Sequence, residues 1–213
     1  MEGFRLGPLW IFGCLRLPTP VLGKTDLWNK VFVFPASSAT ATVHLPVSNH
    51  QPLTQLTVCL SYYTLLSRPY ALFSYATQSA SNDFLIIRFS STDYYVYIGG
   101  AALNFNVPPK EKPSWEHICV SWDSRNGLVQ LWLNGEPLPR QGLKKGYSLS
   151  GFDFNQSFVG EISNVNMWAR VLPPVGIRML RNNITPPDPL IYWRSLRYTI
   201  KNEVYVWGPI VPL

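Results

Sequence analysis

Short apolar runs separated by turn residues constrain the fold of this chain more than any other feature. The runs are rich in β-branched and aromatic residues, as strands are, and 19 Pro and 14 Gly are spread along the chain. Many short strands at this spacing predict an all-β fold of two antiparallel sheets packed as a sandwich. We expect the strands at residues 30–34, 40–45, 56–63, 70–75, 84–89, 94–98, 103–107, 117–122, 127–133 and 160–168.

Local patterns add turns and a helix to this prediction. Asn126-Gly127 and Asn134-Gly135 are typical of hairpin connections, because both residue types tolerate a positive φ. One short helix is expected at 175–181, where Pro173-Pro174 provides a start signal.

The charge and hydropathy patterns exclude two classes of partner. The formal net charge is +6, but the basic residues are scattered and their densest pair is Lys144-Lys145. Nucleic-acid binding needs a basic patch or a recognisable motif, so we expect no nucleic-acid partner. No apolar run approaches the roughly 20 residues of a membrane-spanning helix, so we expect no transmembrane span.

Residues 1–23 resemble a signal peptide, with Arg5 before a short apolar stretch and small residues before Lys24. Basic and proline residues interrupt the part that a signal peptide keeps apolar, so this leader is atypical. We interpret 1–23 as a leader and 24–213 as one domain, which would be extracellular if the leader functions.

The chain has three cysteines, Cys14, Cys59 and Cys119. Removal of the leader takes Cys14 away and leaves two, which suits one disulfide in an oxidising compartment. Two free buried thiols in a cytosolic protein are the alternative, and the leader favours the disulfide.

Residues 117–124 read HICVSWDS, which fits the pattern His-x-Cys-x-Ser-Trp-x-Ser with five specified positions in eight. This pattern is the signature of the pentraxin family. Other segments are similar to pentraxins as well, among them KTDLWNKVFVFP at 24–35 and SFVGEISNVNMW at 157–168. The resemblance covers essentially all of 24–213, and within the family the chain looks most like the mucosal pentraxins.

The resemblance implies a flattened jelly-roll sandwich related to lectin and laminin-G domains, with a disulfide between Cys59 and Cys119. It implies a secreted innate-immune protein that forms a homopentamer and binds phosphocholine-like or microbial surface ligands through two calcium ions per subunit. Asp123 and Lys145 stand where pentraxins carry opposite charges that meet between subunits.

The chain departs from the family at the calcium ligands. Asn82 and Gln156 match two amide ligands of the family, but Ser81 replaces the carboxylate beside Asn82. The Glu-Gln-Asp run of the family has no counterpart, because the segment between Tyr147 and Gln156 is shortened. Calcium affinity decreases when anionic ligands are lost, so we expect weak or lost calcium binding. Two nearby acids, Asp83 and Asp153, are possible replacements. Asp83 is more simply read as a solvated turn residue.

The expected pocket for the organic part of the ligand differs too. Pentraxins that bind choline receive its ammonium group with an aromatic ring and a Glu, through cation–π attraction and charge. Those two positions fall on Ile87 and Ala102, whereas Tyr97 matches a family tyrosine. Two glycosylation sequons begin at Asn155 and Asn183.

Three functions follow from these observations. The first is a secreted pentraxin-type pattern-recognition protein with an impaired calcium site, and the second is an inactive relic of that family. The third is a glycan-active sandwich enzyme, which would need two facing carboxylates; no catalytic motif supports it, so we expect no enzyme. The histidines His44, His50 and His117 show no zinc spacing, and we read His117 as a hydrogen-bonded residue at the start of a strand.

Overall fold

The structure is a computed structural model that describes residues 23–47, 51–75, 82–110, 112–149 and 158–213. The predicted leader, apart from Gly23, lies outside the described residues, so this prediction is not tested by the structure. So do four of the candidate site residues: Ser81, Asp153, Asn155 and Gln156.

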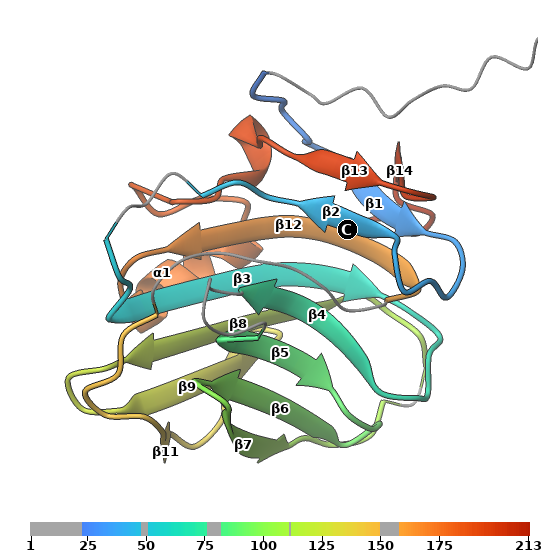
Figure 1. Cartoon of the computed structure of the whole chain (residues 1–213). Coiled ribbons are helices and arrows are strands. Elements are labelled where there is room, and N and C mark those ends of the chain that lie inside the picture. Colours follow the sequence, from blue (N-terminus) through green and yellow to red (C-terminus); the bar gives the residue numbers. More distant parts are fainter. Residues whose placement is uncertain (1–22, 48–50, 76–81, 111, 150–157) are drawn as a thin grey trace, which may run out of the picture.

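Two antiparallel sheets face each other and confirm the predicted sandwich (Figure 1). The larger sheet has the strand order β10-β9-β8-β3-β12-β1-β14, with β11 also paired to β9, and the smaller has the order β4-β5-β6-β7. The larger sheet contains β1 (Val31–Phe34), β3 (Gln55–Tyr63), β8 (Glu116–Asp123), β9 (Leu128–Leu133), β10 (Glu136–Pro137), β11 (Gln141–Gly142), β12 (Gly160–Trp168) and β14 (Tyr205–Trp207). The four-stranded sheet contains β4 (Tyr70–Tyr75), β5 (Phe84–Arg88), β6 (Asp93–Ile98) and β7 (Ala101–Asn106).

All ten expected strands are present, with ends within two residues of the predicted ones. The structure adds four strands of two or three residues and a short 3-10 helix that sequence patterns did not indicate. These are β10, β11 and β14, together with β13 (Thr199–Lys201), which pairs with β2 (Thr42–His44), and η1 (Trp193–Ser195).

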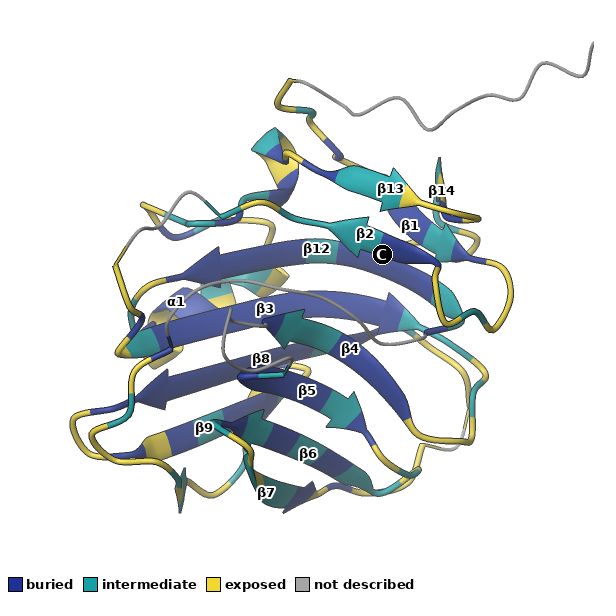
Figure 2. Ribbon diagram, in the orientation of Figure 1, coloured by how far each residue is buried: buried dark blue, intermediate teal, exposed yellow. Residues whose placement is uncertain are grey.

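Alternation along the strands sends one row of side chains into the space between the sheets (Figure 2). From β8, Ile118, Val120 and Trp122 are fully buried there. Tyr62 from the larger sheet meets Tyr94 from the smaller, and their hydroxyl groups are hydrogen-bonded to each other. Burial is the largest cause that raises the pKa of both tyrosines, so both stay neutral.

The opposite face of the larger sheet, which we call the helix face, carries the disulfide and the only α-helix of the described residues. Helix α1 (Pro174–Arg181) begins at the predicted proline pair. It packs over the disulfide between Cys59 and Cys119, whose sulfur atoms are 2.05 Å apart. The disulfide is therefore confirmed, and the alternative of two free thiols is wrong.

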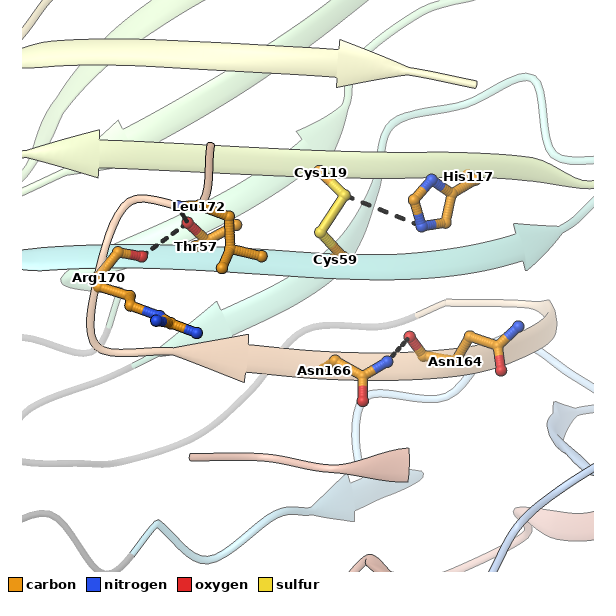
Figure 3. The surroundings of a disulfide bond; sticks show 8 residues. All are labelled: Thr57, Cys59, His117, Cys119, Asn164, Asn166, Arg170 and Leu172. Carbon is orange, nitrogen blue, oxygen red and sulfur yellow. Dashed lines mark hydrogen bonds between the residues drawn. A yellow bond between two sulfur atoms is a disulfide. The ribbon is translucent and has the colours of Figure 1, made fainter. Parts of the chain in front are cut away.

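Thr57 of β3 forms hydrogen bonds to the turn before α1 (Figure 3). The Thr57 hydroxyl donates to the Arg170 carbonyl oxygen over 2.8 Å and accepts from the Leu172 amide over 2.9 Å. One buried hydroxyl thus pairs with both a backbone C=O and a backbone N–H in the connection between β12 and α1.

The two Asn-Gly pairs differ in geometry. Asn134 and Gly135 both have positive φ, 53° and 87°, as the prediction required for the turn between β9 and β10. At Asn126-Gly127, between β8 and β9, only Gly127 has a positive φ, 74°. The hairpin is confirmed there, but its turn uses the glycine alone.

Candidate functional site

Asn82 and Asp83, the calcium-loop residues that the structure describes, lie directly before β5. The Oδ1 atom of Asn82 accepts a hydrogen bond from the Ser74 hydroxyl over 3.0 Å. This amide oxygen, the one expected calcium ligand within the described residues, therefore already has a partner on β4.

Asp83 is not a solvated turn residue, so that reading is wrong. Its exposed fraction is 1%, and its Oδ1 atom accepts a hydrogen bond from the Tyr147 hydroxyl over 2.6 Å. That hydrogen bond, followed by burial, raises the pKa of Tyr147 to about 12. The Tyr147 ring lies against Gly99, where a Cβ atom would come within 2.8 Å of Cζ. Tyr147 stands 64 residues from Asp83, so no local pattern pointed to this pair.

These residues do not fit a two-calcium site. Calcium takes six to eight oxygen ligands, several of them carboxylates in tight sites. The described part of the loop offers one amide oxygen and one buried carboxylate, and both are hydrogen-bonded within the chain. Elsewhere in the described residues the one group of possible metal ligands is Cys59, His117 and Cys119, whose two sulfur atoms are bonded to each other.

The residues expected to bind the organic part of the ligand lie on the outer face of the four-stranded sheet, which we call the ligand face. Tyr97 of β6 is paired directly with Ala102 of β7, and Ile87 of β5 is paired with Tyr95, two residues from Tyr97. The structure thus brings the three predicted residues onto one face. The Tyr97 ring stacks on that of Tyr95 with centroids 6.3 Å apart, and Tyr95 lies 5.0 Å from the half-exposed Phe89.

One acidic residue of the ligand face escaped the sequence analysis. Asp93 starts β6, and its carboxylate accepts hydrogen bonds from the side chains of Ser90, Thr92, Asn104 and Asn106. The hydrogen bond from Ser90 is the first cause that lowers its pKa. Since its oxygen atoms are taken up within the chain, Asp93 does not replace the missing Glu of a choline pocket.

The remaining candidates lie apart from both places. Asp123 is 7% exposed and accepts hydrogen bonds from Arg125 and Gln55, each over 2.8 Å. The Arg125 hydrogen bond lowers the pKa of Asp123 to about 2. Lys145 is exposed, and Asn183 is exposed just after α1. Asp123 and Lys145 are thus not paired with each other, and a role between subunits stays a prediction.

The variant Tyr147→Phe is expected to lower the free energy of unfolding by about 2 kcal/mol, because the buried Asp83 carboxylate loses its donor. Since the folded pKa of Tyr147 is raised to about 12, this contribution is complete below pH about 10 and is lost as the pH rises toward 12. Urea unfolding at pH 7 measures it, with Tyr205→Phe on the exposed edge strand as the matched control. Equal stability of the two variants would contradict the role assigned to Tyr147.

Comparison with known proteins shows the family to which the chain belongs. The profile described as the Pentaxin family matches residues 30–208. C-reactive protein of Sus scrofa is 39% identical over 89% of this chain and 91% of its own length. Serum amyloid P-component of Bos taurus is 39% identical over 93% of this chain and 97% of its own length.

A solved structure agrees on the fold. The native heptameric SAP-like pentraxin from Limulus polyphemus superimposes with a TM-score of 0.75 at 22% identity, over 87% of this chain and 98% of that one. The family match spans most of the chain, and the sandwich, the disulfide and the helix face are those expected of such a domain. This chain belongs to the pentraxin family.

Proposed function

We propose that this chain is a secreted pattern-recognition protein of the pentraxin type whose calcium affinity is strongly reduced. The pentraxin match supports the recognition role, and the ligand face is its proposed binding surface for phosphorylated or carbohydrate ligands. One observation carries the reduced affinity: Asp83, the carboxylate beside Asn82, is buried and held by Tyr147. Recognition of a quaternary ammonium group is weakened as well, because Ile87 and Ala102 provide neither a ring nor a charge.

Calorimetric titration of the purified chain with calcium tests this proposal. We expect no saturation below about 1 mM, the weak end of the range for extracellular calcium modules. The variant Ser81→Asp, which returns the family carboxylate, is expected to bind more tightly than the natural chain. Saturation at micromolar calcium in the natural chain would overturn the proposal.

We also propose a homo-oligomeric ring, five subunits by family expectation, in which Asp123 and Lys145 contribute to the contacts. The relative from Limulus polyphemus is heptameric, which supports a ring without deciding the number of subunits. Light scattering of the purified protein measures the mass, and a monomer at all concentrations would contradict the ring. No helix of the described residues is long and apolar enough to cross a membrane.

Secretion distinguishes the working protein from the relic. In animal cells that express the full chain, we expect the protein in the medium with Cys59 and Cys119 joined. Retention and degradation inside the cell would favour the relic. We propose no enzymatic activity for the domain.

A further inference from the structure

The structure contains a cavity of about 270 Å³ on the helix face. Its lining includes Leu180 and Arg181 at the C-terminal end of α1. Helix α1 lies on the opposite side of the larger sheet from β4–β7 (Figure 1). The cavity shares no lining residue with the calcium loop or the ligand face. A volume near the lower end of small-molecule pockets suits a ligand of one sugar ring rather than a long chain.

Polar residues of neighbouring strands form one side of this cavity. Ser61 of β3 is the register partner of His117 on β8 and of Ser163 on β12. Asn134, at the end of β9, accepts a hydrogen bond from the His117 amide over 2.9 Å. The strand order therefore places a row of polar side chains across the sheet where the strands' other residues are mostly apolar.

His117 has hydrogen-bonding capacity that the described residues leave unused. Its Nδ1 atom is shut off from solvent and has no hydrogen-bond partner among them. The prediction of a hydrogen-bonded residue at the start of a strand therefore holds for the amide and for Nε2 but is wrong for Nδ1. The Nε2 atom lies 3.8 Å from the Cys119 sulfur (Figure 3). Burial lowers the pKa of this imidazole to about 4, so the ring is neutral near pH 7. Because Nδ1 is closed to solvent, the His117 ring forms part of the cavity wall and this nitrogen is not a contact for a ligand.

Asn164 lines the same cavity from a strained position. It has a φ of 53° inside the irregularity that shifts the β12 register between Ser163 and Asn166. The Asn166 side chain already has partners, since its nitrogen donates to the Asn164 carbonyl oxygen and its oxygen accepts from the Trp193 amide. The Asn164 side chain makes no hydrogen bond to the described residues. Bulges and left-handed residues of this kind often aim side chains at binding sites.

Arg181 gives the cavity its charge. It is the last residue of α1, and its side chain lies over Gly135, where a Cβ atom would come within 2.7 Å of Cδ. It forms no ion pair within the described residues, and no lining residue has a carboxylate side chain. The other lining arginine, Arg194, is neutralised by Asp26 at 2.9 Å. One guanidinium is thus left to pair with an anion, for which its planar donors suit a carboxylate.

Aromatic rings line much of the remaining cavity, together with Leu180, Asn183, Thr185 and Leu213. Trp28 is half-exposed at the rim beneath Arg194, whose guanidinium carbon lies 4.7 Å from the ring centroid. Trp115 and Tyr192 also line the cavity. Flat apolar rings beside a few directed polar groups form a surface for a ring-shaped ligand that carries hydroxyl groups.

We propose that this cavity binds a single acidic sugar residue, with its carboxylate on Arg181 and a hydroxyl group on Asn164, and that calcium takes no part. Glycans that end in such a sugar are the corresponding ligand class. This site is independent of the function proposed above, because none of its residues belongs to the calcium loop or the ligand face.

Titration by NMR or calorimetry in the presence of a calcium chelator tests the site, with glucuronic acid and N-acetylneuraminic acid as probes and glucose as the neutral comparison. We expect saturable binding of at least one acidic sugar and at least about tenfold weaker binding of glucose. The variant Arg181→Gln is expected to weaken acidic-sugar binding at least about tenfold. Arg178→Gln on the same helix, exposed and outside the cavity, is the matched control and should bind as the natural chain does.

Asn164→Gly gives a second measurement, because it removes the side-chain amide and keeps a residue that adopts a positive φ readily. It is expected to weaken binding without lowering the unfolding midpoint. The proposal is overturned if neither acid binds at millimolar concentration, if glucose binds equally well, or if Arg181→Gln and Arg178→Gln behave alike. Because the sugar titration is done without free calcium, its result does not depend on whether the chain binds calcium. The calcium titration in turn does not depend on whether the cavity binds a sugar.

Discussion

The double variant Cys59→Ala/Cys119→Ala is expected to lose about 4 kcal/mol of unfolding free energy. The disulfide joins residues 60 positions apart, and the chain-entropy estimate for a loop of that length is about 4 kcal/mol. The cross-link also bonds β3 to β8 at the register pair Cys59 and Cys119, in the middle of the larger sheet. Urea unfolding followed by tryptophan fluorescence measures the shift in midpoint.

Reduction separates the loss of the cross-link from the change of side chain. The natural chain with a dithiol reductant should approach the stability of the double variant, whereas the variant should not respond to the reductant. An unfolding midpoint that neither treatment moves would contradict the stabilising role of this disulfide.

The variant Trp168→Ala is expected to cost about 3–5 kcal/mol, as for other buried tryptophans that are truncated to alanine. Trp168 is fully buried beside the disulfide and packs with Leu172 and Ile177. Its indole nitrogen donates to the Pro187 carbonyl oxygen over 3.1 Å. The substitution therefore leaves a cavity and also removes a hydrogen bond that holds the segment after α1.

Trp207→Ala is the matched control for this variant. Trp207 lies on the edge strand β14 with 73% of its surface exposed, so its removal should change stability by no more than about 0.5 kcal/mol. The measurement belongs at a protein concentration where the chain is monomeric, because an exposed tryptophan can also contribute to subunit contacts. Equal losses for Trp168→Ala and Trp207→Ala would contradict the packing described for the helix face.

Some features of the candidate site could be predicted from the sequence and others could not. The resemblance placed Ile87, Tyr97 and Ala102 in one pocket, and register pairing brings them onto one sheet face. It also predicted Asn82 as a calcium ligand, which stays a prediction, but it did not reveal that Asp83 is buried and hydrogen-bonded by Tyr147. Nor did it reveal the unused Nδ1 atom of His117, since a strand-start histidine looks the same in sequence whether or not it has a partner.

The sequence by itself determined the ten predicted strands, the Asn134-Gly135 turn and the helix after Pro173, because alternation and turn preference act over a few neighbouring residues. The family followed from the local motif at 117–124, and the disulfide followed from the resemblance to that family and from the two cysteines outside the predicted leader. Only the tertiary structure decided which group donates a hydrogen bond to Asp83 and which groups surround Arg181, because those partners come from distant segments of the chain. The two-residue strands β10 and β11 belong to the same class, since they are too short to show a period and exist only by pairing with β9.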